Sequence, residues 1–210
     1  MQAKDPTLCA SSPAGPDGDR LPHTGIDAGE GRPTQPRADS DERPLLMVDI
    51  DGVISLFGPP GDRGSEGSFH AIDGIPHFLS SAAAAHLLSL AEAYDLVWAS
   101  GWEEKAEEYL PHLLGLPAGL PFLRFARGQG AGRSIEGHWK LDAIDAHAGN
   151  RPLAWIDDAF DQSCHVWAAE RPAPTLLVET APSLGLTSPE ARLLAKWALA
   201  PARPPAGAPS

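Results

Sequence analysis

The sequence lacks the features of several protein classes, beginning with cysteine. Its two cysteines, Cys9 and Cys164, provide neither the disulfide framework of small secreted proteins nor the spacing of a zinc site. No apolar run approaches the roughly 18 residues of a membrane helix. The first residues also lack the basic start and apolar stretch of a secretion signal. We therefore expect a cytoplasmic protein that does not span a membrane, with Cys164 packed inside a helix.

Basic residues are scarce as well. The 210 residues include 16 Lys and Arg against 28 Asp and Glu, which gives a formal net charge of −12. An acidic surface disfavours broad binding to nucleic acids, since such binding depends on neutralising many phosphates with cations. It still allows a local basic rim around a site. Hydrophobic residues make up 42% of the chain, which is enough for the core of one domain.

Both ends of the sequence have little apolar content. Residues 1–43 and 201–210 are mixtures of Pro, Gly, Ala and polar residues without an apolar run. Such segments bury too little surface to offset the entropy of ordering. We predict that both are disordered tails and that residues 44–200 form a single domain.

Within that domain, apolar strand patterns alternate with helical patterns. Strands are predicted at 45–50, 95–99, 120–125, 152–156 and 175–178, and helices at 80–94, 103–114, 139–148, 160–170 and 188–200. Strands that alternate with helices predict an α/β fold with a five-stranded parallel sheet. A serine at 188 followed by Pro189 predicts the start of the last helix.

Polar residues follow three of these strands directly. The first strand runs into Asp49 and Asp51, Ser100 follows the second, and Asp157 and Asp158 follow the fourth. In open α/β sheets, ligands bind beyond the carboxyl ends of the strands, where the strand order reverses. If the first and fourth strands are neighbours at that point, all four carboxylates converge.

Converging carboxylates repel one another and need a cation. Only oxygen ligands are available here, which favours a hard ion, and Mg²⁺ fits best because it also binds substrate phosphates. Gly52 permits a sharp turn that re-aims Asp51 away from Asp49. Asp49 would then attack phosphorus to form an aspartyl-phosphate, while Asp51 moves the protons. Alone, this Asp-x-Asp-Gly segment is also compatible with an ordinary turn after a strand.

Four segments in order resemble the motifs of the haloacid dehalogenase-like (HAD) superfamily. They are Met47-Val-Asp-Ile-Asp-Gly-Val53, Leu96-Val-Trp-Ala-Ser100, His138-Trp-Lys140 and Ala154-Trp-Ile-Asp-Asp158. More narrowly, Val97-Trp-Ala-Ser-Gly-Trp102 and Trp155-Ile-Asp-Asp158 look like the small HAD domains associated with Swiss Army Knife RNA-repair proteins. The resemblance implies a Rossmann-like three-layer core.

The resemblance also implies roles for these residues. Asp49 would be the nucleophile and a metal ligand. Asp51 would be the general acid and base, with its backbone carbonyl on the metal. Ser100 and the Gly101 amide would hold phosphoryl oxygens, and Lys140 would neutralise phosphate charge.

For the metal, the resemblance implies that Asp157 binds Mg²⁺ and that Asp158 acts through water or supports the other ligands. The acid two residues after the nucleophile resembles the pattern of the phosphatases in this superfamily, whereas the dehalogenases lack this acid. Residues 53–79 are too few and too rich in Gly and Pro for a large cap domain, so we expect only a short flap over an open site.

Further candidates for substrate binding lie near these motifs. Arg124, Arg127 and Arg133 follow the third strand and could bind additional phosphates, or simply form a solvated loop. Trp102 could stack on a base, or pack against the flap or the next helix.

The sequence thus predicts a Mg²⁺-dependent phosphatase that acts through an aspartyl-phosphate on Asp49. Its substrate would be a phosphorylated small molecule or a nucleic-acid end, and no obligate protein partner is inferred. One alternative is a catalytically inactive phosphate-binding or regulatory module with the same fold. Another is a glycosyltransferase-like Asp-x-Asp metal site, but this would not explain Lys140 or the acids after the fourth strand.

Overall fold

The computed structural model describes residues 43–59, 66–125 and 137–200. These residues belong to one compact unit, Ala38–Ser210. The predicted tails at 1–43 and 201–210 lie outside the described residues except for Arg43, and Arg127 and Arg133 also lie outside them. No helix in the described ranges is long and apolar enough to cross a membrane.

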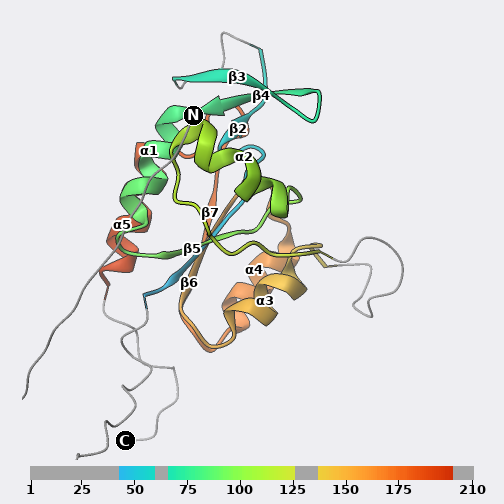
Figure 1. Cartoon of the computed structure of the whole chain (residues 1–210). Helices are drawn as coiled ribbons and strands as arrows, with labels where there is room; N and C mark the ends of the chain where they lie inside the picture. The colour runs from blue at the N-terminus through green and yellow to red at the C-terminus, as the bar shows by residue number, and fades with distance from the viewer. Residues whose placement is uncertain (1–42, 60–65, 126–136, 201–210) are drawn as a thin grey trace, which may run out of the picture. The chain divides into compact units, whose positions relative to one another are not determined.

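A parallel sheet forms the centre of the domain, as predicted (Figure 1). Its strands lie in the order β5-β1-β6-β7, and every neighbouring pair is parallel. The strands are β1 (Leu45–Val48), β5 (Asp95–Trp98), β6 (Leu153–Asp157) and β7 (Thr175–Glu179). β1 and β6 are therefore neighbours, which the convergence of the acidic residues requires.

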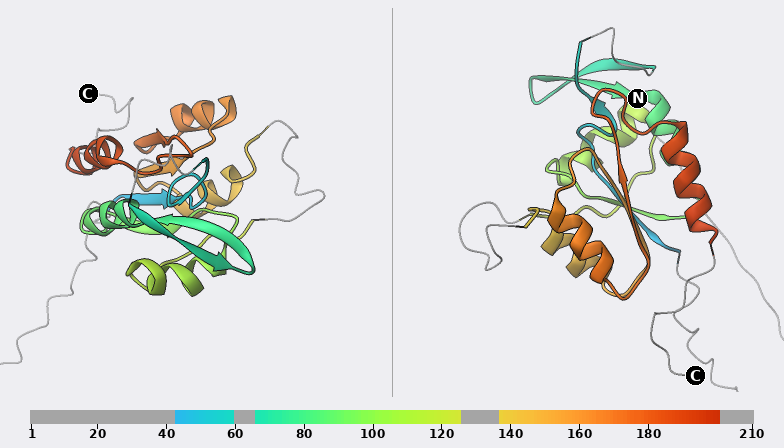
Figure 2. Two further views of the ribbon diagram at one scale, coloured as in Figure 1. Left: turned by 90° about the horizontal axis from the view of Figure 1, so that it is seen from above. Right: turned by 180° about the vertical axis from the view of Figure 1, so that it is seen from behind.

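Helices cover both faces of this sheet, which confirms the predicted three-layer core. They are α1 (Ser81–Leu90), α2 (Glu104–Leu114), α3 (Leu141–Ala148), α4 (Gln162–Glu170) and α5 (Ser188–Ala198). α1 and α5 lie on one side of the sheet, and α3 and α4 on the other (Figures 1 and 2). Alternate side chains of β1 serve the two layers, because successive side chains of a strand point to opposite faces. Leu46 and Val48 pack in the cluster that contains α1, α2 and α5, whereas Leu45 and Met47 pack in the cluster with α3 and α4.

Capping side chains mark the beginning of α1, α4 and α5. The Ser80 side chain accepts from the Ala83 N–H at α1, and Asp161 accepts from Ser163 and Cys164 at α4. At α5 the capping residue is Thr187 rather than the predicted Ser188, since the Thr187 N–H donates to Glu190 Oε2 at 3.1 Å. Cys164 is buried on α4, as expected.

The predicted strand at 120–125 is wrong as a full strand, so the sheet has four strands rather than five. This segment makes a single parallel bridge to β5, between Trp98 and Phe122. Trp98 N–H donates to Pro121 O, and Leu123 N–H donates to Trp98 O. Pro121 has no N–H to extend the ladder, so the pairing ends after one bridge at the edge of the sheet.

The predicted flap is a small antiparallel sheet. Its strands β2 (Ser55–Leu56), β3 (Gly67–Ile72) and β4 (Ile75–Ser80) lie in the order β2-β4-β3. β3 and β4 are joined at Asp73 and Gly74, which both have positive φ (51° and 80°), as a tight hairpin turn requires. Tyr109 Oη on α2 donates to Asp73 Oδ1 at 3.1 Å. β2 follows β1 after one turn, so the small sheet adjoins the carboxyl end of β1 (Figure 1).

Candidate active site

Three carboxylates from β1 and β6 meet at the carboxyl edge of the sheet. Val48 pairs with Ile156 across the two strands, and the Asp49 N–H donates to Ile156 O at 3.0 Å. Asp49 and Asp157 are buried, and Asp158 is half-buried. One oxygen from each of these three residues lies within 4.8 Å of the other two. The separation is short enough for Asp49 and Asp157 to share a cation.

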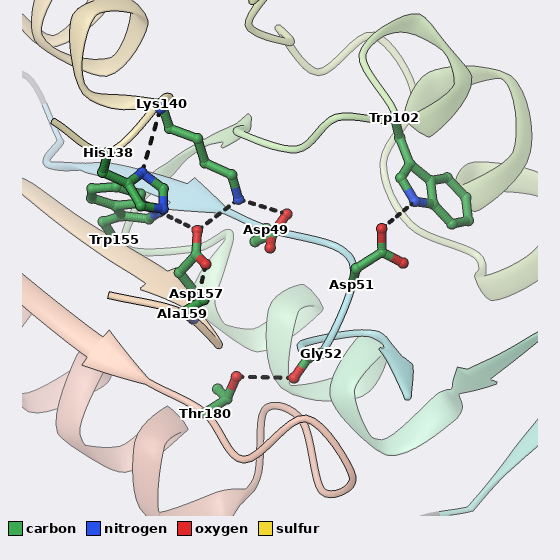
Figure 3. Close-up of polar contacts among 10 residues, drawn as sticks. All are labelled: Asp49, Asp51, Gly52, Trp102, His138, Lys140, Trp155, Asp157, Ala159 and Thr180. Atoms are coloured by element: carbon green, nitrogen blue, oxygen red, sulfur yellow. Dashed lines mark hydrogen bonds and ion pairs between the residues drawn. The ribbon is translucent and has the colours of Figure 1, made fainter. Parts of the chain in front are cut away.

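Lys140 lies between two of these carboxylates, Asp49 and Asp157 (Figure 3). Its Nζ is 2.9 Å from Asp49 Oδ1 and 2.7 Å from Asp157 Oδ2, and its side chain is almost fully buried. Three carboxylates and one ammonium leave two negative charges uncompensated when all are ionised. A buried excess of this size is costly without a counter-ion, so the group fits a divalent cation.

Asp157 is held by three donors. Lys140 Nζ and Trp155 Nε1 donate to its Oδ2, and the Ala159 N–H donates to its Oδ1 at 3.2 Å. An ionised carboxylate offers about four lone-pair sites, so at least one stays available for a metal. Sequence reasoning missed the role of Trp155, although its spacing from Asp157 places both side chains on the same face of β6.

Burial changes the acidity of the site. Desolvation raises the pKa of Asp49 from 3.8 to about 6, against the lowering effect of Lys140 and together with the nearby Asp157. Burial and Asp157 also raise the pKa of Asp158. Burial lowers the pKa of His138, whose ring packs edge-on against Trp155. In the metal-free protein, the anionic forms of Asp49 and Asp158 are therefore disfavoured. A bound cation would stabilise these anionic forms.

The stability of the metal-free protein should depend on pH through Asp49. Its pKa of about 6 lies above the ordinary 3.8 expected of an unfolded chain. Between these values the folded state binds more protons, so the free energy of unfolding should fall as pH rises through this range and level off near pH 7. Urea denaturation in EDTA measures this, with Asp49→Asn as the control. The free energy of unfolding of the wild type, minus that of the variant, should fall by about 1 to 3 kcal/mol as pH rises through this range. A constant difference would contradict the raised pKa.

Asp51 points away from this cluster (Figure 3). Trp102 Nε1 donates to Asp51 Oδ2 at 3.0 Å. Asp51 Oδ1 is buried and has no hydrogen-bond partner among the described residues. The Asp51 carboxylate is not one of the three that cluster. The role of Asp51 as a metal ligand therefore concerns its backbone carbonyl and stays a prediction.

Gly52 makes the turn between the two acids possible. Its φ is +72°, and a Cβ at this position would lie 2.1 Å from Asp158 Oδ2. Thr180 Oγ1, which follows β7, donates to Gly52 O at 2.9 Å and is buried. Sequence reasoning missed Thr180, although it is a polar residue directly after the last strand and therefore at the same edge.

Ser100 lies at the end of β5, beside β1. Its side chain is buried, and its Oγ has no hydrogen-bond partner in the described part of the chain. A buried hydroxyl without a partner is costly and indicates a missing ligand. Gly101, the next residue, is exposed. A hydroxyl and an adjacent backbone N–H at a strand end are suitable donors for an anion.

Trp102 and Arg124, which were also predicted to contact substrate, are engaged within the protein. Trp102 is only 9% exposed, and its ring packs edge-on against the His77 ring, with 4.8 Å between the ring centroids. Arg124 Nη1 lies 3.1 Å from Glu104 Oε2, and its guanidinium lies over the ring of Phe122. A role for Arg124 in binding substrate stays a prediction. Arg127 lies outside the described residues.

The sequence of the domain matches the model of a known protein family. Residues 45–191 match a protein family described as the HAD domain in Swiss Army Knife RNA repair proteins. The match spans β1 to the first part of α5 and includes every acidic residue of the site. No curated protein matches the chain.

Proposed function

This chain belongs to the family of HAD domains in Swiss Army Knife RNA repair proteins, and from this membership we propose that it is a Mg²⁺-dependent phosphatase with Asp49 as its nucleophile. The observation that carries the proposal is the buried group of Asp49, Asp157, Asp158 and Lys140 at the end of two neighbouring strands. Family membership supports a phosphatase-type hydrolase, and the geometry supports a cation and a phosphate at one point.

The donor set fits Mg²⁺. The ligand atoms that the three acidic side chains offer are all oxygens, and Mg²⁺ takes one or two carboxylates together with waters and phosphate oxygens. Asp49, Asp157 and the backbone carbonyl of Asp51 would hold the ion, with Asp158 acting through water. When bound, Mg²⁺ would neutralise charge on the phosphoryl group and on the carboxylates.

Two displacements complete the proposed reaction. In the first, an Asp49 carboxylate oxygen attacks phosphorus, the bond to the leaving oxygen breaks, and Asp51 gives its proton to that oxygen. In the second, Asp51 takes a proton from water, the water oxygen attacks phosphorus, and the bond to Asp49 breaks. Inorganic phosphate leaves, and both carboxyl groups return to their starting states.

The remaining residues would stabilise the transferring phosphoryl group. Its equatorial oxygens carry negative charge, and catalysis of this transfer depends mainly on positioning and charge neutralisation. The unpaired Ser100 Oγ and the Gly101 N–H are proposed donors to two of these oxygens. The Lys140 ammonium, 2.9 Å from Asp49 Oδ1, is within reach of a phosphoryl group attached there.

We propose a bulky phosphoester as the substrate, with a nucleic-acid end as the first candidate and a nucleotide as the second. The flap is a small sheet rather than a domain, which is compatible with a large substrate. The name of the family refers to RNA repair proteins. The net charge of −12 argues against extended binding along a nucleic acid, so recognition would be confined to the end. The cytoplasmic location stays a prediction.

Phosphate release from an aryl phosphate should require a divalent cation. Treatment with EDTA should lower the rate by at least about 100-fold, because the carboxylate charge that Lys140 does not compensate would then repel the phosphate. Added Mg²⁺ should restore the rate. Initial rates of phosphate release measure this, with zinc and calcium as comparison ions. Equal rates with and without EDTA would contradict the metal-dependent reaction.

The substrate class needs a separate experiment. Oligonucleotides with a 3′- or 5′-phosphate, nucleotides and sugar phosphates should be compared at equal concentration. Turnover of sugar phosphates with none at nucleic-acid ends would contradict the preferred substrate but leave the phosphatase intact. Binding of phosphate without turnover of any ester would instead favour the catalytically inactive module.

A further inference from the structure

A hydrogen bond joins Asp51 to the tryptophan that follows the phosphate-binding turn. Trp102 Nε1 donates to Asp51 Oδ2 at 3.0 Å, across 51 positions of sequence (Figure 3). The other carboxylate oxygen, Oδ1, is buried and has no partner among the described residues. The two oxygens of Asp51 are therefore different: the indole holds Oδ2, whereas Oδ1 has no partner within the described ranges and keeps its hydrogen-bonding capacity for a reacting group.

The chemistry of the indole ring makes this difference decisive. An indole N–H only donates hydrogen bonds, so the oxygen facing it must act as an acceptor. The carbonyl oxygen of a protonated carboxyl group is a better acceptor than its hydroxyl oxygen, so the indole N–H favours the proton of Asp51 on Oδ1. We infer that Trp102 is a positioning residue that makes Oδ1 the proton-carrying oxygen of Asp51. This inference rests on the proposed function, in which Asp51 is the general acid and base.

The small sheet holds the indole in place. The Trp102 ring packs edge-on against the His77 ring at 4.8 Å, with an angle of 70° between the rings. Ser55 Oγ and His77 Nδ1 are hydrogen-bonded at 2.9 Å, which links β2 to β4 beside the ring. Trp102 is also only 9% exposed. Its position agrees with the packing against the flap that the sequence offered as one alternative, and it suits a fixed donor to Asp51 better than an open stacking surface.

The fixed carboxyl group serves both displacements. In the first, the proton on Oδ1 passes to the leaving oxygen as its bond to phosphorus breaks. In the second, Oδ1 receives the proton from the attacking water. Without the indole N–H, the carboxyl group can rotate and can carry its proton on either oxygen. Misplaced proton transfer of this kind costs about 10- to 100-fold in rate.

Trp102→Phe tests this role, since it removes the N–H and keeps an aromatic ring. The rate constant kcat/KM should be compared for an alkyl phosphate and for 2,4-dinitrophenyl phosphate. An alkoxide needs a proton as it leaves, whereas dinitrophenolate does not. The variant should therefore lose about 10- to 100-fold on the alkyl ester and less than about threefold on the dinitrophenyl ester.

Trp167→Phe is the matched control. Trp167 Nε1 donates to Asp145 Oδ1 at 2.9 Å, between α4 and α3 and away from Asp51. This variant loses the same kind of hydrogen bond, and both esters should be hydrolysed at the wild-type rate. A second variant carries benzothienylalanine at position 102, which replaces the indole N–H with sulfur at nearly the same ring size. It should show the same selective loss even if phenylalanine loosens the packing.

The outcomes separate this inference from the proposed function. Equal losses on both esters would reduce Trp102 to a packing residue, and unchanged rates on both would show that the N–H is not used. Either result overturns the inference and leaves the phosphatase standing. A wild-type protein that hydrolyses neither ester overturns the proposed function and this inference together.

Discussion

Replacing Asp49 with asparagine should lower the rate of phosphate release by about 10⁴-fold or more. The amide cannot attack phosphorus, so the proposed covalent step is lost while the volume of the side chain is kept. Initial rates with an aryl phosphate and Mg²⁺ measure the loss. In the wild-type protein, borohydride reduction during turnover should convert Asp49 to homoserine, which mass spectrometry locates.

The control for Asp49→Asn is a carboxylate outside the site. Asp145 lies on α3 and accepts a hydrogen bond from Trp167. Asp145→Asn removes a negative charge without touching the acidic cluster, so its rate should stay near that of the wild type. Equal phosphate release by wild-type protein and Asp49→Asn would remove the nucleophile assignment. Labelling of a different aspartate would move that assignment.

Replacing Gly52 with alanine should lower activity by about 100-fold or more and weaken Mg²⁺ binding. A Cβ at this position would lie 2.1 Å from Asp158 Oδ2 and would force the carboxylate away from Asp49 and Asp157. The φ of +72° adds a backbone cost of about 1 kcal/mol for alanine. Rates of phosphate release and calorimetric titration with Mg²⁺ measure the two effects.

Gly115→Ala separates the backbone cost from the steric one. Gly115 ends α2 with a φ of +67°, and nothing lies within 4 Å of the position that a Cβ would take. This variant should lose a similar amount of stability and keep both activity and Mg²⁺ affinity. If Gly52→Ala behaves like Gly115→Ala in every measurement, the contact with Asp158 does not matter for the site.

The buried strands were the most predictable part of the fold. β1 and β6 are covered on both faces, so they appear in the sequence as short continuous apolar runs. The segment at 120–125 has a similar composition but makes one bridge only. Its failure depends on Pro121, whose missing N–H limits an edge strand more than composition reveals.

The small antiparallel sheet was less visible in the sequence. Most of β3 is exposed, so its apolar residues follow no clear alternation. Pro76 within β4 also argued against a strand, although β4 tolerates it near its start. The turn at Asp73-Gly74 was the available signal, because this pair favours tight hairpins between strands. The hairpin was therefore predictable from Asp73 and Gly74 rather than from the strands on either side.

The site was predictable where it depends on strand ends, and less so where it depends on side-chain contacts. The positions of Asp49 and Asp157 follow from the fold class alone. The partner of Asp51 does not, since Trp102 comes from a different loop and the direction of its N–H depends on His77 and Ser55. Such contacts between distant loops leave no periodic pattern in a single sequence.

The pairing of β1 with β6 has a consequence for how this site tolerates change. Neighbouring parallel strands are separated by about 4.8 Å, which is also a suitable separation for two carboxylates that share one small cation. Since Val48 pairs with Ile156, the next residues on each strand, Asp49 and Asp157, inherit that spacing from the main chain. Losing one residue from β1 would turn its last side chain to the opposite face, even if the strands still paired. Insertions and deletions in these two strands would therefore displace the acidic cluster even where the sheet still forms.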